Sequence, residues 1–187
     1  MITGVITSAH EKVRAYLKDG GIAVDATSGQ GRDTVFLATH ASHVYAFDIQ
    51  EEAVDATRCV VDAAGLTSKV TCVCQSHAAM RDIVKEPVRV VVFNLGYLPG
   101  GDKTLTTRVE STLIALKQAL IMLEVGGLLS VSVYPGHKEG KKEAHAIELF
   151  MASLPAKHYV VMKESMLNRH HAPYNVFVYK QSNPITH

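Results

Sequence analysis

The hydrophobic and polar positions of this chain follow two spacings in turn, one typical of strands and one typical of helices. Short apolar runs predict strands at residues 22–26, 44–48, 70–74, 89–95, 128–134, 159–163 and 176–180. Apolar residues three or four positions apart predict helices between most of them, at residues 5–18, 32–40, 51–64 and 77–84, after residue 107, and before Pro155. Alternating strands and helices indicate an α/β fold with a parallel sheet.

One predicted helix carries clear signals at both ends. Thr107 and Glu110 have the spacing of a capping box, so the helix is expected to begin there. It is expected to stop at the pair Gly126-Gly127, before the strand at 128–134.

The last two predicted strands break the alternation. The segment between them, ESMLNRHHAPYN at 164–175, is too short and irregular for a crossover helix, so these strands should pair antiparallel. The run VVVF suits a strand that is buried on both faces. The expected fold is a doubly wound, seven-stranded, Rossmann-like α/β sheet in a single domain, 1–187, mostly parallel with an antiparallel last strand.

Composition supports one folded domain and excludes several classes of protein. The 187 residues are 47% hydrophobic and 20% charged, which is typical of a globular domain and excludes intrinsic disorder. No apolar run approaches the roughly 20 residues of a membrane span, and the N-terminal stretch carries charges where a signal peptide is apolar. The three cysteines have neither disulfide nor zinc spacing, so a cytoplasmic protein is expected.

Charge and histidine content narrow the chemistry further. The net charge is +1, so no overall polycation points to nucleic acid. Ten histidines are present, but none lies in an HExxH motif, and no metal is expected. Cys72 and Cys74 share one face of a predicted strand, where they are expected to be buried and inert.

The first strand leads into a glycine-containing loop, VDATSGQGRDT at 24–34, which is a candidate ligand site. Ligands of open parallel sheets bind beyond the carboxyl ends of the strands. Gly29 and Gly31 allow a sharp turn and a close approach to a ligand. Asp25 is placed to accept from a ligand ammonium, and Asp48, at the end of the second strand, to take both hydroxyls of a ribose.

Two cofactors compete for this loop. A nicotinamide fingerprint requires GxGxxG, but this chain has Thr34 where the third glycine or alanine belongs. An aspartate before the glycines and an acid at the end of the next strand fit S-adenosylmethionine better, since that molecule has an amino acid tail and a ribose but no pyrophosphate.

A polar, glycine-rich segment, NLGYLPGGDK at 94–103, follows the fourth strand and should lie beside the cofactor. Asn94 is placed to accept a hydrogen bond from a nucleophilic amine and so to aim the lone pair of the amine nitrogen at a methyl group. Tyr97 offers a ring that can stack on a base, which contributes about 1–3 kcal/mol.

These motifs resemble a known family along the whole chain. VDATSGQGRDTVFLA at 24–38, FDIQ at 47–50 and FNLGYLPGGDKTLTT at 93–107 are similar to the small bacterial methyltransferases once labelled rRNA methylases, which act as tRNA 5-(aminomethyl)-2-thiouridine methyltransferases. The resemblance implies a class I methyltransferase fold. It also implies methyl transfer from S-adenosylmethionine to the aminomethyl nitrogen of a wobble uridine, with the anticodon arm of tRNA as partner.

The resemblance also implies roles for individual residues. It places Asp25, Thr27, Gly29, Gly31, Arg32, Asp33 and Thr34 in the cofactor loop, Asp48 and Gln50 on the adenosine, and Ser76 and His77 beside the adenine. Asn94, Leu95 and Gly96 line the methyl-transfer site, with Asn94, Tyr97 and Asp102 as the catalytic candidates. Lys103, Thr106, Arg169 and His170 are the substrate-side candidates, although the stretch NRHHAPYN at 168–175 departs from the amide- and proline-rich segment expected there.

Methylation of an amine needs the neutral amine, so a group must accept its proton. Asp102, His170, His171 and water are the candidates, and the sequence does not choose among them. His10, on the first helix, is placed to cover the cofactor. His137, Lys138, Lys141 and Lys142 are placed to contact tRNA phosphates. A homodimer is also expected, because a small chain needs more surface to hold tRNA.

Three other functions compete with this interpretation. A methyltransferase of the same class acting on ribosomal RNA or on a small amine would keep the same loop. A non-catalytic module would bind S-adenosylmethionine without turnover, which the intact segment at Asn94 disfavours. A dehydrogenase is disfavoured by Thr34.

Overall fold

The computed structural model describes residues 4–95, 109–136 and 138–184, and its strands form one sheet. The strands are β1 (Ile22–Asp25), β2 (His43–Asp48), β3 (Val70–Cys74), β4 (Val88–Asn94), β5 (Leu123–Val133), β6 (Tyr159–Glu164) and β7 (Tyr174–Lys180). Their order is β3-β2-β1-β4-β5-β7-β6. Strand β7 is antiparallel to both of its neighbours and the other pairs are parallel, as the sequence predicted.

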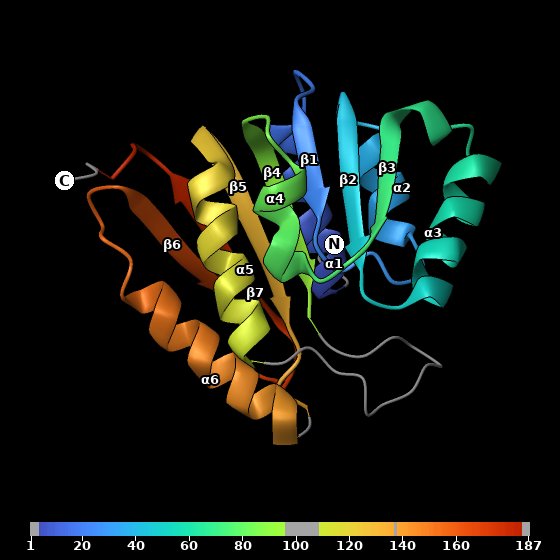
Figure 1. The fold of residues 1–187 in the computed structure, drawn as a ribbon. Coiled ribbons are helices and arrows are strands. Elements are labelled where there is room, and N and C mark those ends of the chain that lie inside the picture. The colour runs from blue at the N-terminus through green and yellow to red at the C-terminus, as the bar shows by residue number, and fades with distance from the viewer. Residues whose placement is uncertain (1–3, 96–108, 137, 185–187) are drawn as a thin grey trace.

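The helices cover both faces of this sheet (Figure 1). They are α1 (Val5–Tyr16), α2 (Arg32–Ala38), α3 (Glu51–Ala63), α4 (Met80–Ile83), α5 (Val109–Met122) and α6 (Lys138–Ala152), with the 3₁₀ turns η1 (Thr67–Lys69) and η2 (His77–Ala79). Helices α4, α5 and α6 lie on one face, whereas α1 and α2 lie on the other. Helix α3 packs against α2, β2 and β3.

Strand β4 shows why the central strands have continuous apolar sequences. Its residues Val91 and Phe93 point into the core beneath α5, while Val90 and Val92 point into the core beneath α1 and α2. Successive side chains of a strand point to opposite faces, so both sets are buried. The doubly wound arrangement predicted from the sequence is confirmed.

The junction between α5 and β5 differs from the prediction. The helix ends at Met122 and the strand begins at Leu123, so Gly126-Gly127 lies inside the strand. The pairing register with β4 shifts there, from Val88 opposite Leu123 to Val90 opposite Leu128. A Cβ on Gly127 would lie 2.9 Å from the carbonyl oxygen of Arg89, so the glycine permits a close-packed irregularity rather than a helix stop. Thr107, half of the predicted capping box, is outside the described residues.

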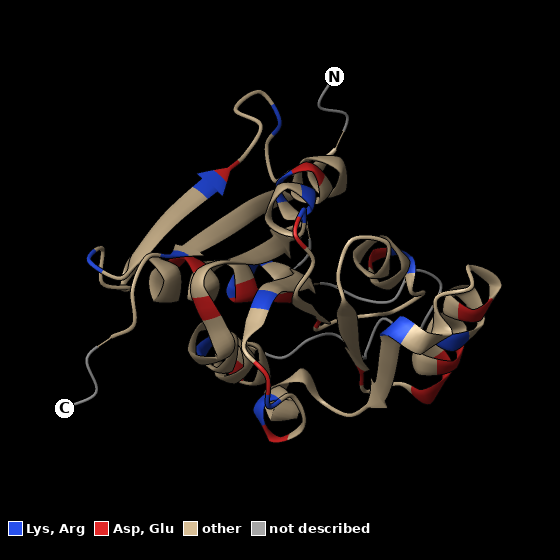
Figure 2. Cartoon of the chain, turned by 90° about the horizontal axis from the view of Figure 1, so that it is seen from above, with Lys and Arg blue, Asp and Glu red and all other residues tan. Residues whose placement is uncertain are grey.

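Charge is mixed over the described helices (Figure 2). Viewed from above, lysine and arginine lie among aspartate and glutamate on them. Within the described ranges, no helix is long and apolar enough to cross a membrane, and no group of three or more histidine, cysteine, aspartate or glutamate side chains is placed to hold a metal ion.

Candidate functional site

Asp25 ends β1 beneath the glycine-containing loop and is completely buried. One carboxylate oxygen accepts from the hydroxyl of Thr34 at 2.6 Å, and the other accepts from the backbone N–H of Thr27 at 3.2 Å. Burial raises the pKa of Asp25 to about 7, and the nearby carboxylates of Asp33 and Asp48 add to this effect. Asp25 therefore lies below the surface of the site and acts on the loop above it.

Asp48, at the end of β2, holds the same loop from the other side. Its two oxygens accept from the backbone N–H groups of Gly29 and Gln50, each at 3.0 Å. The hydroxyl of Thr57, on α3, donates to the carbonyl of Gly29 at 3.3 Å. The loop conformation is therefore fixed by neighbouring elements of the chain itself.

Gly31 begins α2 in a left-handed conformation, with φ of 77°. A Cβ at this position would lie 2.5 Å from Cγ2 of Val60 and 2.8 Å from Cα of Thr57, both on α3. The sequence interpretation assigned Gly31 to close approach of a ligand. In the structure, the missing side chain makes room for the neighbouring helix α3, and the close approach of a ligand stays a prediction.

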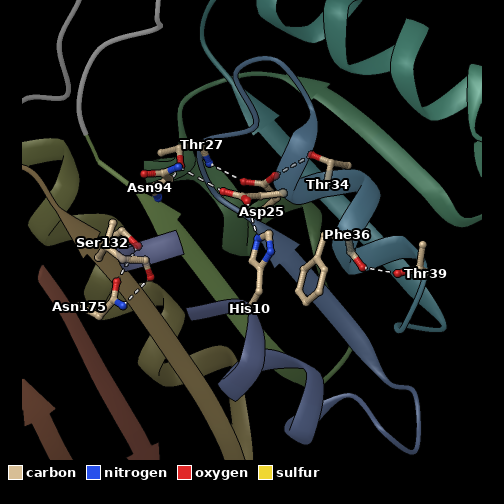
Figure 3. Close-up of polar contacts among 11 residues, drawn as sticks. His10, Asp25, Thr27, Thr34, Phe36, Thr39, Asn94, Ser132 and Asn175 are labelled. Atoms are coloured by element: carbon tan, nitrogen blue, oxygen red, sulfur yellow. Dashed lines mark hydrogen bonds and ion pairs between the residues drawn. The ribbon is translucent and has the colours of Figure 1, made fainter. Parts of the chain in front are cut away.

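Asp33, in the first turn of α2, connects His10 and Asn94, which come from two other segments and are labelled in Figure 3. One carboxylate oxygen lies 2.8 Å from Nε2 of His10, on α1, and the other accepts from Nδ2 of Asn94 at 3.2 Å. The His10 ring stacks on Phe36, with ring centroids 3.8 Å apart and planes 3° apart. The backbone N–H of Asn94 donates to the hydroxyl of Thr27 at 2.8 Å. The ends of β1 and β4 are thereby linked to α1 and α2.

Tyr134, directly after β5, is a member of this group that the sequence interpretation missed. Its side chain hydrogen-bonds to Asn94, and burial together with the charge of Asp33 raises its pKa to about 12. The only signal in the sequence was its position at the end of a predicted strand. A hollow in this region is lined by residues of α1, α2, β4 and β5, among them Ile6, His10, Asp33, Phe36 and Ser132.

His77 lies at the end of the connection after β3 and is only 8% exposed. Its Nδ1 lies 3.1 Å from the carbonyl oxygen of Ala26, while Nε2 is buried with no hydrogen-bond partner within the described part of the chain. Burial lowers the pKa of His77, which favours the neutral ring. The hydroxyl of Ser76 accepts from the backbone N–H of Ala78 and caps the following turn.

The structure brings most of the predicted residues to one edge of the sheet. At or beside the carboxyl ends of β1, β2, β3 and β4 lie the loop at residues 25–34 and five further residues, namely Asp48, Gln50, His77, Asn94 and Leu95. Leu95 is buried and Arg32 is exposed. Arg169, His170 and His171 are exposed between β6 and β7 and do not enter this group. Gly96, Tyr97, Asp102, Lys103, Thr106 and His137 are outside the described residues.

The comparisons with known proteins agree with this architecture. The family model described as "Putative rRNA methylase" matches residues 44–180. The tRNA (mnm(5)s(2)U34)-methyltransferase, chloroplastic, of Arabidopsis thaliana is 40% identical over 94% of this chain and 69% of its own length.

Two solved structures are similar over nearly their full lengths. A "putative rRNA-methylase" from Clostridium thermocellum has a TM-score of 0.94 at 33% identity, covering 96% of this chain and 99% of that one. A "putative methyltransferase" from Streptococcus mutans, solved in complex with SAH, has a TM-score of 0.89 at 37% identity, with the same coverage.

The sheet, in which β7 is antiparallel to its neighbours and the other pairs are parallel, is shared with solved methyltransferases and defines a class I methyltransferase. Within that class, the chain belongs to the family described as "Putative rRNA methylase".

Proposed function

We propose that this chain transfers a methyl group from S-adenosylmethionine to the aminomethyl nitrogen of a modified uridine at the wobble position of tRNA. The observation that carries the proposal is the meeting of three carboxylates with the amide of Asn94. Asp25, Asp48 and Asn94 lie at the ends of β1, β2 and β4, and Asp33 lies in the first turn of α2 beside them. The substrate is taken from the 40% identical Arabidopsis relative, whose name specifies mnm(5)s(2)U34 in tRNA.

The acidic edge of the sheet fits a cationic ligand. Among the described residues, neither lysine nor arginine pairs with Asp25, Asp33 or Asp48, and the one ion-pair contact is His10 with Asp33. Burial is the main cause of the raised pKa of Asp25, and the carboxylates of Asp33 and Asp48 add to it; the sulfonium and ammonium groups of S-adenosylmethionine would offset this second, repulsive contribution. When bound, S-adenosylmethionine supplies an electrophilic methyl group.

The roles proposed for individual residues follow from their positions. Asp48 keeps lone pairs free for ribose hydroxyls while its backbone contacts hold it in place. Asp25 is buried, so we assign it to shaping the loop through Thr27 and Thr34 rather than to direct contact with a ligand ammonium. Gln50, Ser76, His77, Leu95 and Gly96 remain proposed cofactor neighbours.

Asn94 is the proposed contact of the reacting amine. Its carbonyl oxygen accepts a hydrogen bond from the neutral amine and orients the nitrogen lone pair. Orientation of reacting groups contributes several kcal/mol to lowering a barrier. Tyr97, Asp102, Lys103 and Thr106 remain proposed substrate-side residues, and Arg169 and His170 remain proposed outer contacts of the RNA.

The experiment is an assay with tRNA from a strain that lacks the gene, using labelled S-adenosylmethionine and mass spectrometry of the nucleosides. The expected result is conversion of 5-aminomethyl-2-thiouridine to its N-methyl form. Asn94→Ala should lose most activity while its affinity for S-adenosylhomocysteine stays within about three-fold. Label on ribosomal RNA and not on tRNA would show that the substrate is ribosomal RNA. Binding of S-adenosylmethionine without any turnover would indicate a non-catalytic module.

The proposed substrate leads to two further proposals, a homodimer that holds the anticodon arm and a location in the cytoplasm. The Arabidopsis relative is named as chloroplastic. Sedimentation of the chain with and without tRNA tests the dimer. A single monomeric species under both conditions would argue against it.

A further inference from the structure

The amide of Asn94 has a defined orientation because its neighbours differ in what they can donate and accept. The carboxylate of Asp33 only accepts hydrogen bonds, so the amide nitrogen must face it, as the 3.2 Å contact shows. The hydroxyl of Tyr134 both donates and accepts, so it fits either orientation of the amide. Asp33 is therefore the neighbour that decides which way the amide points.

Asp33 is itself held in place. Its second oxygen is bound by Nε2 of His10 at 2.8 Å, and the His10 ring is stacked flat on Phe36, one turn further along α2. The side chain of Asp33 is 12% exposed and that of His10 is 27% exposed, so His10 covers the carboxylate from the solvent side. Each oxygen of Asp33 holds one protein group, His10 or Asn94, so the carboxylate links the two and can position Asn94.

We infer that Asp33, held by His10, is a positioning residue that turns the carbonyl oxygen of Asn94 toward the reacting amine. This inference deepens the proposed function and rests on the proposed role of Asn94. The reverse orientation would place the amide oxygen against a carboxylate oxygen, two acceptors facing each other. Without Asp33, both orientations become accessible, and only one presents an acceptor to the amine.

The kinetic test uses Asp33→Asn, which keeps the shape but provides an amide that can either donate or accept. We expect kcat to fall at least about ten-fold, while KM for tRNA and the affinity for S-adenosylhomocysteine stay within about three-fold. In the double variant with Asn94→Ala, the residual rate should equal that of Asn94→Ala alone, because Asp33 acts through Asn94. If Asp33 only supported the fold, the double variant would be slower than Asn94→Ala alone.

His10 gives a second, milder variant with a matched control. His10→Phe keeps an aromatic ring on Phe36 but removes the contact with Asp33, and it should lower kcat in the same direction as Asp33→Asn. His40 also lies against Phe36, with centroids 5.0 Å apart, but has no contact with Asp33. His40→Phe should therefore leave kcat within about two-fold.

A spectroscopic readout makes the inference independent of turnover. The side-chain amide signals of Asn94, identified by their loss in Asn94→Ala, should shift in Asp33→Asn and in His10→Phe but not in His40→Phe. If the unmodified protein binds S-adenosylhomocysteine but methylates nothing, the proposed function fails while these signals still test the orientation.

Three results would overturn the inference. The first is a parallel loss of cofactor affinity in Asp33→Asn, which would make Asp33 a ligand-binding residue. The second is an independent, multiplicative loss in the double variant. The third is an Asn94 amide signal that has the same chemical shift in Asp33→Asn as in the unmodified protein.

Discussion

Gly31 shows how strongly a single position is constrained where the loop meets α3. Its φ of 77° disfavours any side chain, and an added Cβ would lie 2.5 Å from Val60. Gly31→Ala should lower the free energy of unfolding by about 2–4 kcal/mol, from backbone strain and overpacking together. Urea denaturation measures the change.

Gly65 is the matched control for that substitution. Its φ is +68°, but a Cβ added there would have nothing within 4 Å. Gly65→Ala should cost only the backbone strain, roughly 1 kcal/mol. Equal losses at the two glycines would show that contact with α3 is not what requires Gly31.

Asp25 should make stability depend on pH. Its pKa is raised from 3.8 to about 7 in the folded protein, mainly by burial, so the folded state binds more protons than the unfolded state between these values. The free energy of unfolding should therefore fall as pH rises from about 4 to about 7, by a few kcal/mol at most, and level off above that. Denaturation at pH 5 and pH 7.5 measures the difference.

Asp25→Asn removes the titrating group and should flatten that dependence, even though it also perturbs the contacts with Thr27 and Thr34. The comparison uses the slope between the two pH values rather than the absolute stability. A slope that persists unchanged in Asp25→Asn would assign the pH dependence to other groups.

Some residues of the site can be predicted from the sequence and others cannot. Asp48 and Asn94 are predictable because each is a polar residue that ends an apolar strand. The contact between His10 and Asp33 is not, because it depends on how α1 crosses the sheet. The position of Tyr134 near Asn94 is not predictable either, since it depends on the pairing of β4 with β5.

Among the elements, the end of α5 depends on a lysine from β7. Lys180 is 4% exposed, and its Nζ donates to the carbonyl oxygens of Leu120 at 3.0 Å and Leu123 at 2.6 Å. These contacts satisfy carbonyl groups that a helix end leaves without partners. Burial lowers the pKa of Lys180, so the charged form is retained at a cost that the two carbonyls offset.

Lys180→Met should lower the free energy of unfolding by about 2–3 kcal/mol, since it leaves two buried carbonyls without a donor. Thermal or urea denaturation checks this. Lys142→Met is the control, because Lys142 is exposed and its ion pair among the described residues is with nearby Glu139, at 2.9 Å; its loss should stay within about 0.5 kcal/mol. A similar effect in both variants would contradict the capping role.

The strands were predictable from their apolar runs, but their surroundings were not. The strand at 70–74 has the predicted bounds, yet β3 is the edge of the sheet, so Cys74 is exposed and Cys72 only half-buried. The prediction that both thiols are buried is wrong for this reason. An edge strand and a central strand of similar sequence differ only in what pairs with them.

At the scale of the whole molecule, α1 joins parts of the chain that are far apart in sequence. Asn175, on β7, donates to the carbonyl of Val5 at 2.8 Å and accepts from Ser132 at 2.9 Å. Ser8 and Lys12 contact Glu164, at the end of β6. With His10 bound to Asp33, α1 is linked to α2 as well as to β6 and β7.

Asn175→Ala should loosen this helix selectively. The substitution removes the donor that links β7 to the Val5 carbonyl and the acceptor of the Ser132 hydroxyl, which costs about 1–3 kcal/mol. Amide exchange measured by mass spectrometry should accelerate in α1 about ten-fold or more, with little change in α5. Asn168→Ala, at an exposed position, is the control. Uniform acceleration across the chain would indicate global destabilisation and not the loss of a local anchor.

Three hydrogen bonds hold the loop between β1 and α2. The N–H of Gly29 donates to Asp48, the carbonyl of Gly29 accepts from Thr57, and the N–H of Ser28 donates to the carbonyl of Phe47. A nucleoside arriving at this edge thus meets a surface that needs no refolding. Calorimetric titration should accordingly give a heat-capacity change to which ordering of the β1–α2 loop contributes nothing.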